Sequence, residues 1–96
     1  MKGLLKMKLN ENFLIHDTGS GEMLIPVEEE TKKFHGIVKL NGTGSEICHL
    51  LEEKDLSLEE LLNHFYDEYP DEDKELIKKS VIDFIEQLKK INAIKD

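Results

Sequence analysis

The chain has 96 residues, of which 39% are hydrophobic and 35% charged, and its formal net charge is −8. This length favours one modest core, and no apolar run approaches the roughly 18 residues that a membrane-spanning helix requires. All thirteen basic residues are lysines, which disfavours proteins that neutralise phosphates and read bases with arginine. The single cysteine, Cys48, and an N-terminus without a secretory cleavage site predict a cytoplasmic protein.

The first third of the chain predicts an antiparallel hairpin. Lys6 to Leu9 alternates lysine with apolar residues, which is typical of an edge strand or of a tail lying on the domain. Residues 13–17 and 22–27 are predicted strands, because the segment between them, Thr18-Gly19-Ser20-Gly21, is rich in residues that tolerate positive φ. Pro26 cannot donate a ladder hydrogen bond, so we expect it at an edge, a bulge or a strand end.

A third strand followed directly by a helix is predicted next. The strand covers residues 34–40 and alternates its side chains between two faces, with Val38 and Leu40 on one and His35, Ile37 and Lys39 on the other. The helix is expected to begin at Thr43, because Thr43-Gly44-Ser45-Glu46 matches a capping box, and to end near Glu53.

Two further helices are predicted in the second half of the chain. Ser57-Leu58-Glu59-Glu60 matches a second capping box, and the helix that it opens should end at Pro70. The acidic residues 71–73 favour the start of a last helix. An apolar stripe marks the core face of that helix and consists of Ile77, Val81, Phe84, Leu88 and Ile91. Asn92 is expected to be left-handed, and Ala93-Ile94 to pack back on the sheet.

The order of these elements predicts the fold class. Three strands followed by three helices indicate an α+β domain of winged-helix type, with a three-stranded antiparallel sheet. The sequence has no internal repeat, low-complexity linker or second set of elements. We therefore expect residues 1–96 to form a single domain.

A second stripe on the last helix is the candidate binding surface. At about 100° per residue, four residues form a shoulder beside the core face: Lys78, Ile82, Ile85 and Lys89. In one interpretation Ile85 is the rim of the core and the lysines are solvated. In the other, the shoulder and the third strand form two walls of a groove, in which a peptide pairs with the strand edge. Carboxylates of that peptide would then be attracted by Lys39, Lys78 and Lys89.

Motifs for metal binding or catalysis are not recognisable in the sequence. Cys48 and His49 are adjacent and diverge by about 100° on a helix, so they cannot easily share an ion. Cys-x-x-Cys and His-x-x-x-His patterns are missing, and His16, His35 and His64 are scattered. The glycines have neither dinucleotide-binding nor P-loop spacing. We therefore expect no catalytic residues, no metal site and no cofactor.

The segment LNGTGSEICHLLEE carries a resemblance to a known family. It resembles the LN-x-TG-x-x-I-x-x-L signature of the PqqD family, whose fold is the RiPP recognition element, and Leu40 to Gly44 with Ile47 and Leu50 is its most specific part. Weaker similarity lies in residues 24–27, 57–61 and 83–88. The sequence departs from the family at two turns, with Glu53-Lys54 in place of Asp-Gly and Asn92 in place of Gly.

The resemblance implies a function. Such domains are non-catalytic and bind the leader of a ribosomally made precursor peptide for a modifying enzyme, often a radical SAM enzyme, as in pyrroloquinoline quinone (PQQ) synthesis. The leader adds as a strand to the third strand and lies against the last helix. The implied peptide-binding residues are therefore His35, Ile37, Val38 and Lys39 on the strand and Lys78, Ile82, Ile85 and Lys89 on the helix.

Two functional hypotheses follow. The first is a peptide-binding accessory protein with a precursor peptide and a modifying enzyme as partners, and without nucleic acid or membrane partners. The second is a winged-helix DNA-binding regulator, whose last helix would enter the major groove. If the first holds, a charged residue at position 82 or 85 should abolish leader binding and leave folding cooperative.

Overall fold

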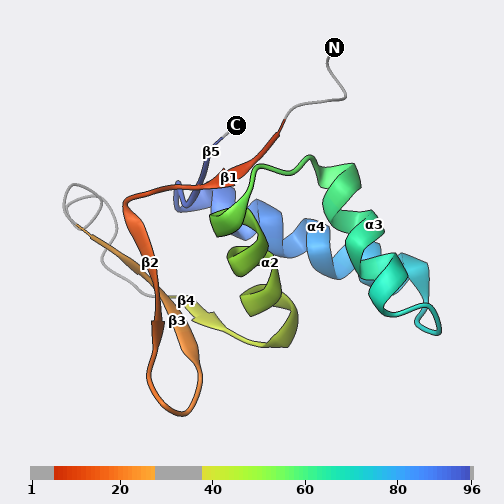
Figure 1. Cartoon of the computed structure of the whole chain (residues 1–96), viewed down its shortest axis with the longest axis horizontal. Helices are drawn as coiled ribbons and strands as arrows, with labels where there is room; N and C mark the ends of the chain where they lie inside the picture. Colours follow the sequence, from red (N-terminus) through yellow and green to blue (C-terminus); the bar gives the residue numbers. More distant parts are fainter. Residues whose placement is uncertain (1–5, 28–37, 96) are drawn as a thin grey trace.

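The computed structural model describes residues 6–27 and 38–95, and Figure 1 shows the order of their elements. The strands and helices are β1 (Lys8–Leu9), β2 (Phe13–Asp17), β3 (Glu22–Pro26), β4 (Val38–Leu40), α2 (Gly42–Glu53), α3 (Leu58–Glu68), α4 (Lys74–Lys90) and β5 (Ile94–Lys95). The predicted α+β class is confirmed, since a three-stranded antiparallel sheet is followed by three helices within the described ranges. No helix there is long and apolar enough to cross a bilayer.

The three-stranded sheet has β3 at its centre, with β2 and β4 on either side. The predicted hairpin is confirmed: the Thr18 amide donates to the Gly21 carbonyl at 2.8 Å. Gly19 has a φ of 91°, which an L side chain rarely adopts, and this explains the glycine in the turn. Pro26 is the last residue of β3, one of the positions expected for it.

A second, two-stranded sheet joins the two ends of the described chain. β1 pairs with β5, so Leu9 lies opposite Ile94, and Figure 1 shows the two strands side by side. Ile94 is buried in the core, and its strand pairs with β1 and not with the three-stranded sheet. Of the two interpretations of Lys6 to Leu9, the strand is the one observed.

The turn between α4 and β5 forms a Schellman motif. The Ala93 amide donates to the Leu88 carbonyl at 2.9 Å, and the Asn92 amide donates to the Lys89 carbonyl at 3.1 Å. Asn92 has a φ of 65°, so the predicted left-handed conformation is confirmed. This turn reverses the chain and directs β5 back to β1.

Of the two predicted helix caps, one is confirmed and the other is wrong. The Ser57–Glu60 capping box is present in both directions, with bonds of 2.9 and 3.1 Å. The capping box predicted at Thr43 is wrong, because α2 begins one residue earlier and Asn41 is its N-cap, accepting from the Gly44 amide. Glu46 is not folded back on the helix start, since its carboxylate contacts His64 on α3.

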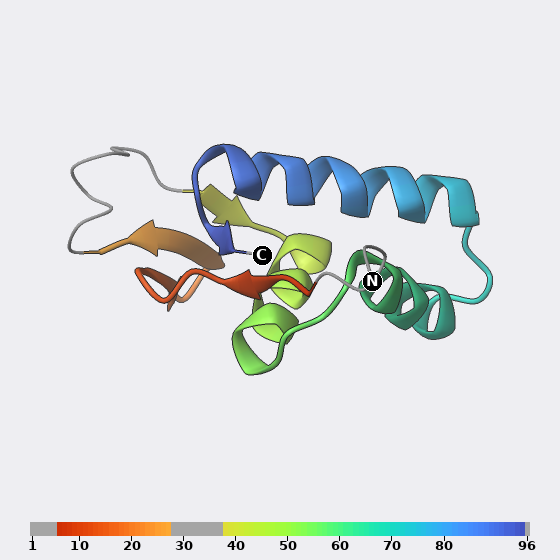
Figure 2. The ribbon, with the colours of Figure 1, turned by 90° about the horizontal axis from the view of Figure 1, so that it is seen from above.

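Helix α4 forms one side of the molecule, with α2 and α3 packed against it (Figure 2). Its fully buried residues are Val81, Ile85 and Leu88. The buried face of α4 is therefore rotated around the helix axis relative to the predicted core stripe. Three residues of the predicted stripe are only half-buried and lie at the rim of the core: Ile77, Phe84 and Ile91. On α3 the buried residues are Leu61, Leu62 and Phe65, whereas Tyr69 at its C-terminal end is 42% exposed.

Candidate functional site

The outer edge of β4 is the first part of the candidate site. β4 pairs with β3 on one side, and on its other side no described residue forms a strand with it. Val38 is half-buried and Lys39 is exposed, as the predicted alternation requires. His35 and Ile37, the other predicted strand residues of the site, lie outside the described residues. The described edge can therefore accept backbone hydrogen bonds from an added strand.

A hollow of about 310 Å³ lies between the start of α2 and helix α4. Its lining comprises Asn41, Thr43 and Gly44 at the beginning of α2 and Ser80, Asp83, Phe84 and Gln87 on α4. Because Asn41 directly follows Leu40, the hollow lies next to the C-terminal end of β4.

The side of α4 that lines the hollow differs from the predicted shoulder. Each of three shoulder residues is two positions from a residue that lines the hollow, which at about 100° per residue places it about 160° away around the helix. The pairs, with the shoulder residue first, are Lys78 and Ser80, Ile82 and Phe84, and Lys89 and Gln87. The predicted shoulder residues Lys78, Ile82 and Lys89 are exposed or half-buried, but they lie on the other side of the buried stripe.

Ile85 requires a correction. Its exposed fraction is 3%, and it belongs to the core together with Val81 and Leu88. A side chain so buried cannot line a groove wall in this conformation. Of the two interpretations of Ile85, the structure therefore supports the core residue. The physical reason is that the core face of α4 is centred between Val81 and Ile85, not on Ile77.

The structure explains why the sequence signature has a glycine at position 44. Gly44 is buried, and a Cβ atom added to it would lie 3.0 Å from Cζ and 3.1 Å from Cε1 of Phe84. Such distances are shorter than ordinary van der Waals contact. The absence of a side chain at position 44 lets α2 approach α4 closely and holds the Phe84 ring against the hollow.

We expect Gly44→Ala to lower the free energy of unfolding by about 1 kcal/mol, since overpacking costs more than the gain in helix propensity. Urea denaturation followed by circular dichroism measures this. Gly42→Ala is the matched control in the same helix turn, because a Cβ there meets nothing within 4 Å. Equal effects of the two substitutions would contradict the role assigned to the Phe84 contact.

A second cleft, of about 440 Å³, adjoins the other side of the α2 N-terminus. Its lining combines apolar and acidic side chains from all three helices: Glu46 with Gly42 and Thr43, Phe65 and Tyr69, and Glu72, Leu76, Ile77, Ser80 and Val81. Tyr69 and Leu76 are 42% and 61% exposed, so part of its apolar wall faces solvent.

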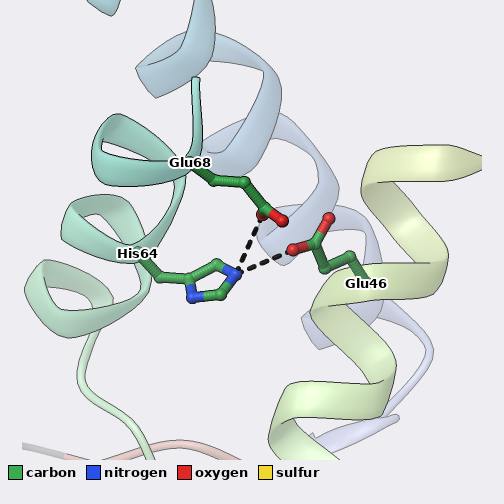
Figure 3. A group of neighbouring side chains, drawn as sticks. All are labelled: Glu46, His64 and Glu68. Carbon is green, nitrogen blue, oxygen red and sulfur yellow. Dashed lines mark hydrogen bonds and ion pairs between the residues drawn. The ribbon is translucent and has the colours of Figure 1, made fainter. Parts of the chain in front are cut away.

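A cluster of ionisable side chains lies at the edge of this cleft and is drawn in Figure 3. The His64 Nε2 atom lies 2.7 Å from Glu46 Oε2 and 3.2 Å from Glu68 Oε1. Burial by itself raises the pKa of Glu46, but hydrogen bonds with Glu68 and His64 outweigh it and lower that pKa overall. The hydrogen bond to Glu46 and its negative charge raise the pKa of Glu68.

A separate set of polar contacts joins α2 to the sheet. Glu22 on β3 accepts from the Ser45 hydroxyl and lies 3.0 Å from His49 Nε2. These bonds lower the pKa of Glu22. Next to them Cys48 is fully buried, and burial together with the nearby Glu22 and Glu52 charges raises its pKa to about 12. The thiol is therefore a poor nucleophile.

The Glu46–His64–Glu68 cluster is the feature that the sequence analysis missed. The cysteine and histidine spacings did not indicate it. His64 and Glu68 are separated by four residues on one helix, so this pair was visible as a pattern. Glu46 lies on another helix, and only the packing of α2 against α3 brings it within reach.

Comparisons with known proteins complete the description. Neither the curated proteins nor the solved structures contain a match to the chain. One family model matches, described as coenzyme PQQ synthesis protein D (PqqD), and it covers residues 21–94. The match begins at the end of the hairpin turn and includes β3, β4, the three helices and every residue that lines the hollow or the cleft. Since it spans well over half of the sequence, the chain belongs to the PqqD family of coenzyme PQQ synthesis proteins.

Proposed function

We propose that this protein is a non-catalytic accessory factor that captures the leader of a ribosomally made precursor peptide and presents it to a separate modifying enzyme. The family resemblance suggests a radical SAM enzyme as that partner. The observation that carries the proposal is the outer edge of β4, which leads into the hollow between α2 and α4. We further propose that residues 1–96 act as one domain in the cytoplasm.

Strand addition to β4 would supply most of the affinity. The backbone groups along an unpaired strand edge form hydrogen bonds with any extended peptide, whatever its sequence. Selectivity must then come from side-chain pockets. The hollow offers the Phe84 ring as its apolar part and Asp83, Ser80 and Gln87 as polar groups. We therefore infer a leader with an apolar side chain that reaches Phe84 after pairing with Val38 and Lys39.

The position of the peptide on α4 separates two versions of the proposal. In the first, it lies against Phe84 and Gln87, beside the start of α2. In the second, it lies against the shoulder predicted from the sequence without the buried Ile85, which leaves Lys78, Ile82 and Lys89. The geometry favours the first, because these three residues lie on the other side of the buried stripe of α4.

The experiment first looks for a short peptide gene beside this one, and then titrates a synthetic peptide with the N-terminal half of its product into the full chain. We expect Gln87→Trp to weaken binding by about tenfold or more, because the ring fills the hollow. Glu86→Trp adds the same ring about 100° away, to an exposed position outside the hollow, and should leave binding unchanged.

The binding results for Ile82→Asp and Gln87→Trp distinguish the two positions of the peptide on α4. If Ile82→Asp abolishes binding and Gln87→Trp does not, the peptide lies on the sequence-predicted shoulder. If the wild-type chain does not bind the peptide under conditions in which it is folded, the peptide-capture proposal is wrong.

The DNA-binding alternative is tested with bulk duplex DNA. A regulator would bind DNA with an affinity that falls steeply as salt rises, because cations are released from the phosphates. With a net charge of −8 and no arginine, we expect no such binding. Salt-sensitive binding to bulk DNA would instead favour the regulator.

A further inference from the structure

The side chains of Glu46, His64 and Glu68 place three potential metal ligands together at the junction of α2 and α3. One carboxylate oxygen of each glutamate and one ring nitrogen of His64 lie within 4.8 Å of one another. Figure 3 shows both carboxylates turned toward the same atom, His64 Nε2. The three side chains come from two helices, so their convergence depends on the tertiary structure.

The distances in the cluster are close to those of a tetrahedral metal site. Zinc binds imidazole nitrogen and carboxylate oxygen at about 2.0–2.2 Å, so neighbouring ligand atoms are about 3.3 Å apart. The two contacts of His64 Nε2 are 2.7 and 3.2 Å. Moving the side chains outward by a few tenths of an ångström would admit an ion, with the metal replacing the proton on Nε2.

The cluster is also held in orientation by its neighbours. The His64 ring contacts the buried Phe65 ring edge to face, with ring centroids 5.2 Å apart. The Tyr69 hydroxyl donates to Glu46 Oε1 at 3.5 Å, which leaves Oε2 directed at His64. His64 and Glu68 are one turn apart on the same helix, so little ordering is required when an ion binds.

The electrostatics of the cluster favour a dication. Two carboxylates converge on one imidazole nitrogen, with Glu46 Oε2 at 2.7 Å and Glu68 Oε1 at 3.2 Å from His64 Nε2, and like charges so close together repel each other. A dication between them would relieve this repulsion. Glu46 also lines the 440 Å³ cleft, so a fourth coordination position would open toward the cleft and accept water or a donor atom of a partner.

We propose that Glu46, His64 and Glu68 form a divalent transition-metal site, selective for zinc over magnesium and calcium, that joins α2 to α3 and leaves one coordination position open to the cleft. Imidazole is a ligand of zinc and its neighbours, whereas magnesium and calcium prefer oxygen alone. This site revises the expectation of no metal, which considered only cysteine and histidine spacings. It is independent of the peptide-capture proposal, since none of its three ligands lines the peptide hollow.

The test is calorimetric titration of the tag-free full chain with zinc chloride alone. We expect one zinc per chain, no comparable binding of magnesium, and an increase in thermal stability on addition of zinc. His64→Ala and Glu68→Gln should each weaken zinc binding by about tenfold or more, and should remove the thermal shift. Glu68 is exposed, so Glu68→Gln tests the site even if the histidine variant folds poorly.

His49→Ala is the matched control. His49 also has two glutamates beside it, but through different ring nitrogens, with Glu22 at 3.0 Å from Nε2 and Glu52 at 3.9 Å from Nδ1. These two carboxylates therefore do not converge on one ligand atom. Zinc binding should persist in this variant. If His64→Ala and Glu68→Gln bind zinc as the wild type does, or if only His49→Ala loses it, the proposed site is wrong.

Discussion

Replacing Ile85 by aspartate should lower the free energy of unfolding by about 4 kcal/mol or more. Ile85 is 3% exposed in the core between α4 and its neighbours. The substitution removes apolar volume and places an unpaired carboxylate where water cannot reach it. A chain of this size has only about 5–15 kcal/mol of stability, so a large fraction of it would be lost. Urea denaturation followed by circular dichroism measures the change.

Ile82→Asp is the matched control, because it makes the same chemical change three residues earlier on the same helix. Ile82 is only half-buried, so its carboxylate can stay hydrated, and we expect a loss of about 1 kcal/mol with cooperative unfolding retained. If Ile85→Asp were as stable as Ile82→Asp, Ile85 would be accessible. That result would restore it as a candidate wall of the peptide groove.

Replacing Asn10 by leucine should lower the free energy of unfolding by about 2–4 kcal/mol. Asn10 is fully buried, and its side chain makes two hydrogen bonds. The amide group donates to the Asn92 carbonyl at 2.8 Å, and the side-chain oxygen accepts from the Asn12 amide at 2.9 Å. Leucine can make neither bond, and each lost bond to a buried group costs about 1–3 kcal/mol.

The measurement for Asn10→Leu is the melting temperature, which should fall by about 10 °C or more, since 1 kcal/mol shifts a domain of this size by about 4–8 °C. Asn63→Leu serves as the control, because Asn63 is exposed in the middle of α3 and should change stability by less than about 0.5 kcal/mol. An unchanged melting temperature for Asn10→Leu would mean that Asn10 does not tie the N-terminal segment to the α4–β5 turn.

Local features of the fold were predictable where neighbours in the chain decide them. The Ser57–Glu60 capping box forms because both partners lie in the same helix turn. Asn92 is left-handed because it follows the last residue of a helix that must end. Thr43 was predicted wrongly as a cap, since Asn41 also satisfies the helix start, and Glu46 has a better partner in His64.

The candidate site was predictable only in part. The strand edge could be inferred, since a third strand with alternating faces was predicted for residues 34–40, and the structure has β4 at Val38–Leu40. The side of α4 that lines the hollow could not be inferred from the sequence. Ile77, Ile82, Phe84 and Ile85 are all apolar, and a helix with apolar residues over so much of its surface permits several choices of core face. The contact between Gly44 and Phe84 selects one of them.

The sequence by itself determined the class of fold, the number and order of its main elements, and the family to which the chain belongs, because periodicity, caps and turn residues act over a few positions. Only the tertiary structure decided which face of α4 is buried, that β1 pairs with β5, and that Glu46 meets His64 and Glu68. These features depend on how residues far apart in the chain pack together. Close packing excludes all but one rotation of each helix, and this selection is invisible in local sequence patterns.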